Sequence, residues 1–561
     1  MRVLVFHGYL LAGTGSNVYN AKLAEALAAA GHEVHLLCQD RQPERLGFVD
    51  ASGEWVGGRL QVRVHREPVR CTVYRPDIGP ILPVYVADRY EGIEARPYPD
   101  CTDEEIAVYV DRNVAAVREV LERARPEAAL ANHLIMGPLI LARGLAGSGV
   151  PYAVKVHGSA LEYTVKPHRD RFLAPAREGL AGARTVLVGS RHTAESLWAT
   201  MDDPLLPART RLGPPGVDVD EFAPRDPEAA AAGLRALSEE LARQDRMAGN
   251  AEVDSAGRTA VDSAGGTAVD SAGGPEVGSG GGADGDAFAR DPGEAARALA
   301  LLEPGRDRLV AFVGKLIVSK GVDLLLAAWP LVLDQVPAAR LVVVGFGAYR
   351  AAFSDLRGAL ADGDIAAARA IAEQGRSLEG GPPRPLHALL EFLDGLGGDE
   401  LARYRLAAGG LRDRVVLTGR LEHDELAEVL PACEAEVVPS TFPESFGMVA
   451  VEAAACGVLP ISAEHSGLAE VSRALATAVP PAAAGWLSFP LQPDPPLQAD
   501  PVRAIAERVV AWLQAPEALR AATRDGLVAI ARERFSWEGV ARGVLAAAQG
   551  RLEALAPPPP D

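Results

Sequence analysis

The sequence predicts an α/β protein with two doubly wound parallel sheets, each forming a Rossmann-like domain, that face a central cleft. In both halves of the chain, apolar runs of strand length alternate with amphipathic helical stretches, which is typical of parallel strands joined by crossover helices. The length of 561 residues also exceeds what one hydrophobic core usually serves. Ligands of such sheets bind beyond the carboxyl ends of the strands, so functional residues are expected in the loops that follow strands.

The N-terminal domain is predicted to span residues 1–215. Its start has the pattern of a strand, a helix and a second strand, at 2–7, 17–30 and 33–38. Between 40 and 100 the chain carries several prolines and is predicted to be loop-rich. A helix is expected at 103–125, and further strands at 128–132, 152–157 and 184–189.

Residues 226–304 are predicted to be a low-complexity, flexible insert. They are rich in Ala, Gly, Asp and Ser, and they contain an eight-residue repeat with too little apolar surface to offset the entropy of ordering. The C-terminal domain then covers 306–515, with a helical insert at 350–410. Its strands are expected at 308–313, 341–345, 414–418, 434–438 and 458–462, followed by a C-terminal helix at 516–550 and a disordered tail at 551–561.

Composition excludes several classes of protein. The formal net charge of −19 argues against a nucleic-acid-binding surface, which needs a basic face. The five cysteines form no CxxC pair, so neither a disulfide framework nor a zinc ribbon is indicated. The first apolar run breaks at His7, and no stretch of about 18 apolar residues occurs, so neither a signal peptide nor a membrane-spanning helix is expected. A cytoplasmic protein is predicted, with peripheral membrane contact left open.

The segment Pro443–Ala453, with the sequence PESFGMVAVEA, carries the strongest functional signal. A strand ends just before it, and an apolar helix is expected to start near Phe446. Its first N–H groups would bind phosphate or sugar oxygens; they belong to Phe446, Gly447, Met448 and Val449. Glu444 could accept hydrogen bonds from sugar hydroxyls, and Glu452, two turns along the helix, could reach ribose hydroxyls. The alternative is an ordinary charge at a helix start and a surface glutamate in mid-helix.

A lysine pair follows the first strand of the C-terminal domain. Only five of the 56 basic residues are lysine. A lysine pair five positions apart, Lys315 and Lys320, therefore indicates a role that arginine would not serve equally well. Each ammonium could contribute about 4 kcal/mol beside a diphosphate at ~4 Å and an effective dielectric constant of ~20. The alternative is a solvated pair before a helix, but the helix dipole disfavours cations there. A bound anion is therefore the better interpretation.

The N-terminal domain offers weaker signals. The loop Gly13–Tyr19 departs from the dinucleotide fingerprint, because Val18 stands at the third glycine position. We interpret Gly15 as a residue that lets a donor approach closely, and Asn17 as a polar contact on the acceptor side; the alternative is a plain turn. His157 follows a strand, as do His7 and His133, and we choose His157 as the catalytic candidate.

No metal and no cofactor are predicted. Three Asp-x-Asp pairs occur, at 218–220, 284–286 and 362–364, but none follows a clear strand at a cleft. The second candidate dinucleotide fingerprint, at Gly345, is also broken, which disfavours a nicotinamide-dependent oxidoreductase. A glycosidase with two catalytic carboxylates would not need the lysine pair.

Together these segments resemble the retaining GT-B glycosyltransferases of family four, also called glycosyl transferases group 1. The resemblance covers residues 1–40, 128–225, 306–349 and 411–547. It implies a GT-B fold and metal-independent transfer of a sugar from a nucleotide diphosphate sugar to an acceptor hydroxyl, with retention of configuration. The acceptor stays open between a small molecule, a glycan and a lipid-linked sugar. The alternative is a catalytically silent nucleotide-sugar-binding protein on the same scaffold.

The resemblance also implies roles for single residues. Lys315 and Lys320 would bind the donor diphosphate, although position 315 is usually Arg in the family. Glu444 would contact the transferred sugar, Glu452 the ribose, and His157 the sugar near the reacting carbon. Residues 15–19 are similar to a loop of the inositol-phosphate N-acetylglucosaminyltransferases that begin mycothiol synthesis.

Overall fold

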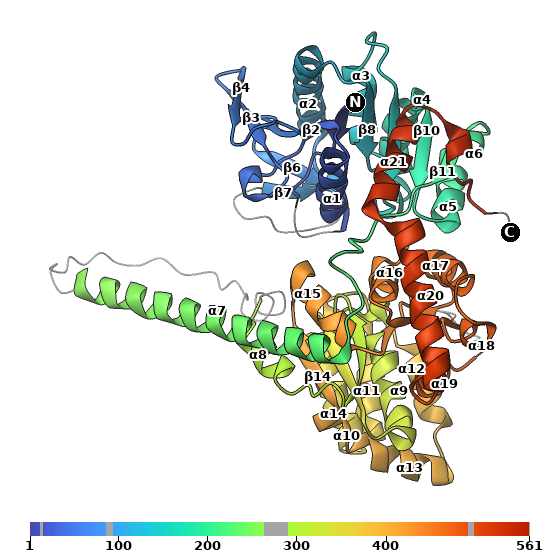
Figure 1. Cartoon of the computed structure of the whole chain (residues 1–561). Coiled ribbons are helices and arrows are strands. Elements are labelled where there is room, and N and C mark those ends of the chain that lie inside the picture. Colours follow the sequence, from blue (N-terminus) through green and yellow to red (C-terminus); the bar gives the residue numbers. More distant parts are fainter. Residues whose placement is uncertain (12–14, 86–93, 263–289, 492–498, 560–561) are drawn as a thin grey trace. The chain divides into compact units, whose positions relative to one another are not determined.

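The chain folds into two compact units. The computed structural model describes residues 1–11, 15–85, 94–262, 290–491 and 499–559, and between 248 and 262 it describes the backbone. Unit 1 consists of Met1–Val217 together with Glu533–Asp561, and unit 2 consists of Asp218–Arg532 (Figure 1). Each unit contains one large sheet, so the predicted fold class is confirmed.

The sheet of unit 1 has nine strands in the order β11-β10-β9-β8-β1-β2-β5-β3-β4. All neighbours are parallel except β3 and β4, which form an antiparallel hairpin. The strands are β1 (Arg2–Phe6), β2 (Glu33–Leu37), β3 (Ala51–Val56), β4 (Arg59–Val64), β5 (Cys71–Arg75), β8 (Ala128–Asn132), β9 (Tyr152–Val156), β10 (Thr185–Val188) and β11 (Thr210–Leu212). A separate parallel pair is formed by β6 (Ile81–Val84) and β7 (Glu94–Pro97).

The prediction that 40–100 is loop-rich is wrong, because five described strands, β3 to β7, lie in this segment. β3 and β4 form a hairpin around Gly57 and Gly58, both with positive φ, and β5 lies inside the sheet between β2 and β3. A Gly-Gly turn between two strands is itself a hairpin signal, because both residues adopt the left-handed backbone that a two-residue turn needs. The density of proline concealed that signal.

Helices cover both faces of this sheet. One face packs against α2, α3, α4 and α5, and the other against α1 and α21, which lie side by side (Figure 1). The helices are α1 (Gly15–Ala29), η1 (Pro43–Arg45), η2 (Tyr98–Asp100), α2 (Asp103–Ala124), α3 (Gly137–Gly144), η3 (Ala160–Val165), α4 (Arg169–Ala181), α5 (Arg191–Met201), α6 (Leu206–Arg209), α21 (Trp537–Ala548) and η8 (Leu552–Ala554). A capping box of Thr102 and Glu105 starts α2 at its predicted position.

The predicted single helix at 516–550 is two helices. Helix α20 (Glu517–Phe535) ends before Ser536, whose side chain accepts a hydrogen bond from Gly539 N and so starts α21. Trp537 and Val544 of α21 are buried in the core of unit 1. The last part of the chain therefore belongs to the N-terminal sheet.

The sheet of unit 2 has six parallel strands in the order β14-β13-β12-β15-β16-β17. They are β12 (Arg308–Val313), β13 (Ala339–Val344), β14 (Val415–Gly419), β15 (Ala435–Val438), β16 (Leu459–Ala463) and β17 (Ser488–Phe489). Its helices include η5 (Val318–Lys320), α9 (Val322–Gln335), α14 (Leu411–Arg414), α15 (His423–Val429), η7 (Leu430–Ala432), α16 (Met448–Ala455), α17 (Ser466–Ala476), α18 (Pro481–Ala484) and α19 (Pro501–Leu513).

The predicted helical insert at 350–410 is present. It consists of α10 (Arg350–Ala361), α11 (Ile365–Gln374), η6 (Arg376–Glu379), α12 (His387–Gly395) and α13 (Gly398–Ala408). It packs on the main body of unit 2, where the buried Tyr404 hydroxyl of α13 donates to the carbonyl of Ala327 in α9 at 2.9 Å.

The prediction of a flexible insert at 226–304 is wrong at both of its ends. Helix α7 (Pro227–Asp262) buries Ala230, Leu234, Leu237 and Leu241, and it packs against α8 (Pro292–Leu299). The spacing of four, three and four residues places these side chains on one helical face. The low-complexity composition hid this apolar stripe. Residues 263–289, which hold the second half of the repeat, lie outside the described residues.

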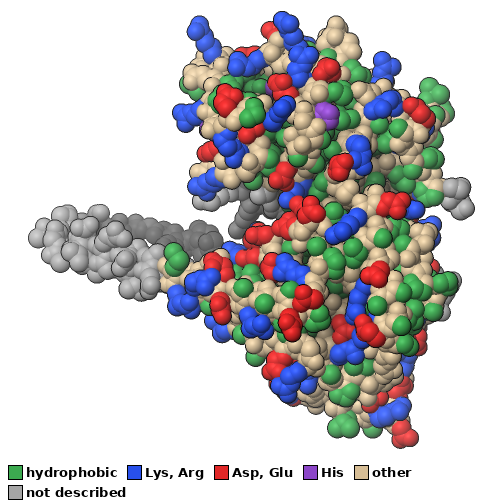
Figure 2. All heavy atoms as spheres, viewed as in Figure 1, with side chains coloured by type: hydrophobic (Ala, Val, Ile, Leu, Met, Phe, Trp, Pro, Cys, Tyr) green, Lys and Arg blue, Asp and Glu red, His purple; other side chains and the backbone are tan. Residues whose placement is uncertain are grey.

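The surface carries charged side chains of both signs, as the composition predicts (Figure 2). Figure 2 shows basic side chains interspersed with acidic ones on the face in view. None of the helices described here has the length and the apolar content needed to cross a lipid bilayer. All five cysteines are buried and free.

Candidate functional site

The two lysines lie in the loop that joins β12 to α9, at the carboxyl edge of the unit 2 sheet. The Lys315 side chain is exposed and makes no ion pair or hydrogen bond with the described residues, whereas Lys320 is half-buried at the end of η5. Gly321 then starts α9 with a φ of 67°, and a Cβ there would lie 2.0 Å from the carbonyl oxygen of Pro439. Only glycine therefore lets the loop pack against the end of β15.

Contacts from two other segments hold this lysine loop in place. Thr441 N donates to Ser319 O at 2.9 Å, which ties the loop to the segment after β15. On the other side, a carboxylate oxygen of Glu379 accepts a hydrogen bond from Val318 N at 2.8 Å. Arg376 donates to the second oxygen of Glu379 at 3.1 Å. The helical insert thus fixes the backbone between the two lysines, a role that its sequence did not reveal.

Lys320 and Glu444 are brought together. Their charged groups form an ion pair, and the same carboxylate oxygen accepts a hydrogen bond from Ser440 Oγ at 2.7 Å. Burial by itself would raise the pKa of Glu444, but the Lys320 charge and these hydrogen bonds outweigh it, so the pKa lies below its usual value. A basic loop and an acidic loop, more than a hundred residues apart in sequence, therefore form one site.

The helix expected at Phe446 starts at Met448, two residues later. Gly447 precedes it with a φ of 114°, and a Cβ there would lie 2.5 Å from the Leu468 side chain. No side chain caps this helix, so the N–H groups of its first turn have no partner within the helix. The start of α16 thus presents the positive end of a helix dipole beside Glu444.

Glu452 is not the mid-helix surface residue of the alternative interpretation. Its side chain is 3% exposed, and one carboxylate oxygen lies 3.0 Å from His423 Nε2 at the start of α15. The His423 ring packs against Phe222, with 4.8 Å between the ring centroids. The neighbouring Glu436 is fully buried without a hydrogen-bond partner, and burial, followed by the charge of Glu452, raises its pKa well above the usual value.

A third loop of unit 2 completes this edge. Ser466 accepts a hydrogen bond from Glu444 N at 2.9 Å, and Gly467 N donates to Glu444 O at 2.9 Å. Ser466 has a φ of 51°, a left-handed conformation that is uncommon for serine and costs energy. His465 binds the carbonyl oxygen of Ser440 through Nε2 at 2.7 Å. The loop therefore holds both sides of the segment that carries Glu444.

In unit 1, a network of asparagines orients the histidines at the strand ends. Asn20 Nδ2 donates to His7 Nδ1 at 3.0 Å, so the His7 proton is on Nε2, which lies 2.9 Å from Asn17 Oδ1. Asn132 Nδ2 donates to Asn20 Oδ1 at 2.7 Å. The direction of every hydrogen bond in this network is therefore determined.

The same network fixes the tautomer of His157. Because the Asn132 nitrogen is used for donation, its Oδ1 must accept, and His157 Nε2 donates to it at 2.8 Å. Burial, and then the nearby His133 and Lys155, lower the pKa of His157 well below its usual value, so the ring is neutral at pH 7. His157 Nδ1 is consequently an unprotonated acceptor that has no hydrogen-bond partner among the described residues.

His133 is the strand-end histidine with the most unusual environment. It is 2% exposed, and both of its ring nitrogens lack hydrogen-bond partners among the described residues. Its ring lies 4.5 Å from that of Tyr85 and 4.9 Å from that of His157, measured between centroids. The backbone φ of 68° is also rare for a residue with a side chain. A buried imidazole without a protein partner leaves hydrogen-bonding capacity that a water molecule or a ligand can satisfy.

The start of α1 carries two of the predicted site residues, Gly15 and Asn17. The side chain of Asn17 is buried, and its Oδ1 lies 2.9 Å from His7 Nε2, so its contact with an acceptor stays a prediction. A Cβ at Gly15 would meet no protein atom within 4 Å, so the fold itself does not require glycine there. Gly13 and Thr14 lie outside the described residues.

Lys155 points into the protein from β9. It is 1% exposed, its ammonium donates to the carbonyl of Gly213, and it lies 5.7 Å from the centroid of the Tyr19 ring. Burial lowers the pKa of Lys155 to about 7. The free energy of unfolding of unit 1 should therefore depend on pH.

The sign of this pH dependence follows from proton binding. Between pH 7 and the unfolded pKa of about 10.4, the unfolded chain binds one proton more than the folded chain, so stability rises with pH, by about 2 kcal/mol from pH 7 to pH 9. Urea unfolding of unit 1, followed by hydrogen exchange of β9 amides, measures this rise. Lys155→Met should remove the rise and the exposed Lys166→Met should keep it; equal curves for all three proteins would contradict the assignment.

No group of three or more His, Cys, Asp or Glu side chains that could hold a metal ion occurs in the described part of the chain. Of the Asp-x-Asp pairs, Asp284 and Asp286 lie outside the described residues. Asp364 caps α11 by accepting from Ala367 N, which is a structural role. The predicted site residues form two groups. One lies at the carboxyl edge of the unit 2 sheet and includes Lys320 and Glu444, and the other lies at the carboxyl edge of the unit 1 sheet and includes His157.

Two family models match the chain. A model described as Glycosyl transferase 4-like domain matches residues 14–216, and one described as Glycosyl transferases group 1 matches residues 392–484. The D-inositol 3-phosphate glycosyltransferase of Segniliparus rotundus is 33% identical over 270 residues, which is 47% of this chain and 46% of that protein. The enzyme of that name from Mycobacterium tuberculosis is 32% identical over 187 residues, 33% of this chain and 28% of that protein. The chain therefore matches less than half the length of these relatives.

Solved structures share the fold over nearly the whole chain. Sucrose-phosphate synthase from Thermosynechococcus elongatus has a TM-score of 0.52 at 19% identity, covering 99% of both chains. Anabaena HepE in complex with UDP and glucose has a TM-score of 0.51 at 13% identity, covering 98% of this chain and 99% of that one. A glycosyltransferase from Rickettsia africae has a TM-score of 0.52 at 12% identity, covering 98% of both chains.

Proposed function

Because the chain belongs to the group 1 glycosyltransferases and has the GT-B fold, we propose that it transfers a sugar from a nucleotide diphosphate sugar to an acceptor hydroxyl. One observation carries this proposal. Two ammonium groups, a free helix N-terminus and the carboxylates of Glu444 and Glu452 gather at the carboxyl edge of one parallel sheet. That combination suits a ligand with a diphosphate and several hydroxyl groups.

The donor diphosphate is proposed to bind at the lysine loop and at the first turn of α16. Lys315 is exposed and ready for a phosphate, whereas Lys320 is paired with Glu444. An arriving diphosphate would share the Lys320 ammonium, and the Glu444 carboxylate would then accept hydrogen bonds from the transferred sugar. Glu452 would bind the ribose hydroxyls, with His423 holding its carboxylate in position.

Bond cleavage is proposed to depend on stabilisation of the leaving group. As the bond to the diphosphate breaks, negative charge grows on its oxygens, and Lys315, Lys320 and the α16 N–H groups stabilise that charge without a general acid. Retention of configuration and independence of metal ions are proposed from the family resemblance. No cofactor besides the donor substrate is required.

Unit 1 is proposed to supply neutral hydrogen-bonding groups for sugar and acceptor hydroxyls. The unprotonated Nδ1 of His157 can accept a hydrogen bond, and the unpaired ring nitrogens of His133 can both accept and donate. Neutral imidazoles suit this role because a sugar hydroxyl carries no charge. The relatives' name makes D-inositol 3-phosphate the first acceptor to test. A cytoplasmic location is also proposed, in keeping with five free cysteines.

Product analysis tests the proposal. The purified chain is incubated with UDP-, ADP- and GDP-linked sugars and a panel of acceptors, and products are identified by NMR, which also gives the anomeric configuration. We expect release of nucleoside diphosphate that depends on acceptor, retains the anomeric configuration and persists in EDTA. Binding of a nucleotide sugar without any turnover would instead support the silent binding protein, and no binding at millimolar concentrations would refute both.

Glu379 provides a test of the lysine loop. Glu379→Ala removes the acceptor of the Val318 N–H, so the loop should become mobile and the KM for the donor should rise about tenfold, since an unmade hydrogen bond costs about 1–3 kcal/mol. Because Glu379 touches no reacting atom, kcat should change little. Steady-state kinetics with varied donor measure both constants.

Matched variants of the insert provide the controls. Glu379→Gln keeps an oxygen for Val318 N and should recover part of the lost affinity. Glu373→Ala, which affects only an exposed pair with Arg369 on the same insert, should leave both constants unchanged. A fall in kcat at constant KM in Glu379→Ala, or an equal effect of Glu373→Ala, would show that Glu379 does not position the loop.

A further inference from the structure

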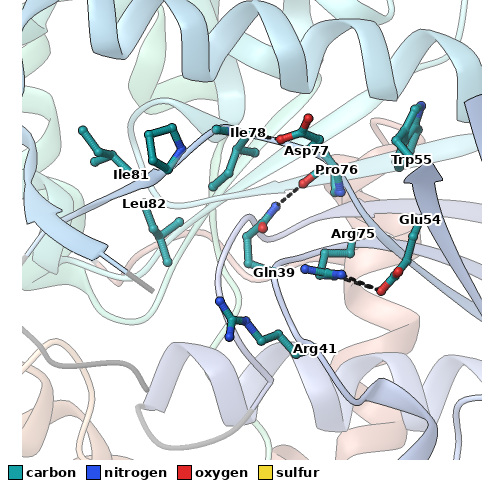
Figure 3. Close-up of a pocket in the computed structure, with 12 residues that line it drawn as sticks. Gln39, Arg41, Glu54, Trp55, Arg75, Pro76, Asp77, Ile78, Ile81 and Leu82 are labelled. Carbon is teal, nitrogen blue, oxygen red and sulfur yellow. Dashed lines mark hydrogen bonds and ion pairs between the residues drawn. The ribbon is translucent and has the colours of Figure 1, made fainter. Parts of the chain in front are cut away.

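A cavity lies at the carboxyl edge of the unit 1 sheet, and none of the strand-end histidines is among its lining residues. It has a volume of about 380 Å³ and is drawn in Figure 3. Its wall is built by the ends of three parallel strands, β2, β5 and β3, which are neighbours in the sheet. The residues that line it include Gln39, Arg41, Glu54, Trp55, Arg75 and Asp77. Ligands of parallel sheets bind at this edge.

The polar groups of the cavity balance each other in charge. Arg75 donates to one Glu54 oxygen through Nε at 3.0 Å and Nη2 at 2.8 Å, as Figure 3 shows. Asp77 pairs with Arg112 at 3.0 Å, and Gln39 Nε2 donates to Pro76 O at 3.1 Å. The lining itself holds two arginines and two carboxylates. A phosphate site needs an excess of cations, so this lining is suited to a neutral ligand with many hydroxyls.

The apolar part of the lining fits the same ligand. Ile78 and Leu82 are buried, and Ile81 and Trp55 are half-buried in the wall. The Trp55 indole is held in place by a hydrogen bond from Nε1 to Glu119 at 2.6 Å. A sugar or cyclitol ring has C–H groups that pack on such surfaces and hydroxyls at its edge that bind paired charged groups.

The cavity is structurally linked to the histidine cluster. Tyr9 O accepts a hydrogen bond from Gln39 N at 2.8 Å, and the Tyr9 ring lies 5.4 Å from that of His133, measured between centroids. One residue thus touches both the cavity wall and the cluster to which we assign sugar contacts. We propose that this cavity binds a neutral sugar or cyclitol ring of the acceptor. The part concerning the acceptor rests on the proposed function.

A cavity-filling variant tests the proposal. Ile81→Trp places an indole in the cavity, and Val64→Trp places the same side chain on the exposed face of β4, outside the lining. Saturation-transfer NMR is recorded with myo-inositol, methyl α-D-glucopyranoside and maltose, and with glucose 6-phosphate as a charged probe. At least one neutral probe should bind the unaltered chain and Val64→Trp, and should bind Ile81→Trp at least about tenfold more weakly because of the steric clash.

Several results would overturn this assignment. They are the absence of binding by all three neutral probes, binding of glucose 6-phosphate alone, and equal binding by Ile81→Trp and the unaltered chain. UDP binding is measured in parallel, because its proposed contacts lie in unit 2 and should be the same in all three proteins. One outcome separates the two proposals: UDP fails to bind in all three proteins, while a neutral probe binds the unaltered chain and binds Ile81→Trp more weakly. In that case the glycosyltransferase proposal fails and the cavity assignment stands.

Discussion

Lys320→Ala should lower kcat by about 10³-fold, comparable to the loss of an electrostatic group that stabilises charge in the transition state. In the structure the Lys320 ammonium is paired with Glu444, and the proposed mechanism requires it on the leaving diphosphate. Its loss would leave Lys315 and the α16 N–H groups as the remaining partners of that charge. Single-turnover kinetics with saturating donor measure the chemical step directly.

The same variant should change the pH dependence of the residual activity. Burial raises the pKa of Glu444, and the Lys320 charge is the largest effect that lowers it. Without Lys320, the pKa of that carboxyl therefore rises. Protonation would then remove the acceptor for sugar hydroxyls at a higher pH than in the unaltered chain, and activity would begin to fall earlier as the pH is lowered. A pH–rate profile from pH 5 to 9 shows this shift.

Lys166→Ala is the matched control. Lys166 is exposed in unit 1 and pairs with Glu162, so its removal should alter neither kcat nor the pH profile. A Lys320→Ala protein that folds and turns over at the normal rate would remove Lys320 from the mechanism. Loss of activity with no change in the pH profile would separate Lys320 from Glu444 and contradict the pairing as a functional unit.

The gathering of the predicted donor-binding residues at one edge of the unit 2 sheet follows largely from the sequence, and donor binding itself stays a prediction. Lys315, Lys320, Glu444 and Glu452 each follow or flank an apolar run of strand length, and strand ends meet at one edge of a parallel sheet. The burial of Glu452 against His423 was not predictable, because the two residues are 29 positions apart and come from different helices. Only packing of the folded chain shows that contact.

The fold was predictable where the hydrophobic period was regular. The pattern failed where composition and periodicity disagreed, as in α7, whose alanine-rich low-complexity sequence still carries a stripe of buried leucines. The pattern also did not predict that α21, which follows unit 2 in the sequence, packs on the sheet of unit 1. A helix pattern predicts that the helix has an apolar face, but it does not predict which sheet that face will cover.

The three strand-end histidines also differ in a way that only the folded chain shows. His7, His133 and His157 have the same place in the sequence pattern, and we selected His157 from its neighbours in the chain. Hydrogen bonding separates them: His7 is bonded at both ring nitrogens, His157 at one, and His133 at neither among the described residues. His133 is therefore the strand-end histidine whose hydrogen-bonding groups the described residues satisfy least.

His133→Asn should therefore reduce kcat/KM about 100-fold without lowering stability. The unpaired buried imidazole costs the free protein about 1–3 kcal/mol, and a sugar hydroxyl would supply its missing partner. Asparagine tolerates the left-handed backbone at this position, so the substitution should not strain the loop. The shorter side chain cannot reach the same hydroxyl. Steady-state kinetics and thermal unfolding are measured on the same protein preparation.

His35→Asn is the opposite case within the same unit. His35 is also buried, but its Nδ1 lies 3.0 Å from the Tyr74 hydroxyl and its Nε2 lies 3.1 Å from a Glu33 oxygen. Its loss should lower the melting temperature and leave kcat/KM unchanged, because both partners belong to the protein. If His133→Asn instead destabilises unit 1 and keeps its activity, His133 is a structural residue. A buried side chain without protein partners contributes few hydrogen bonds to the folded state, so its replacement should affect ligand binding more than folding.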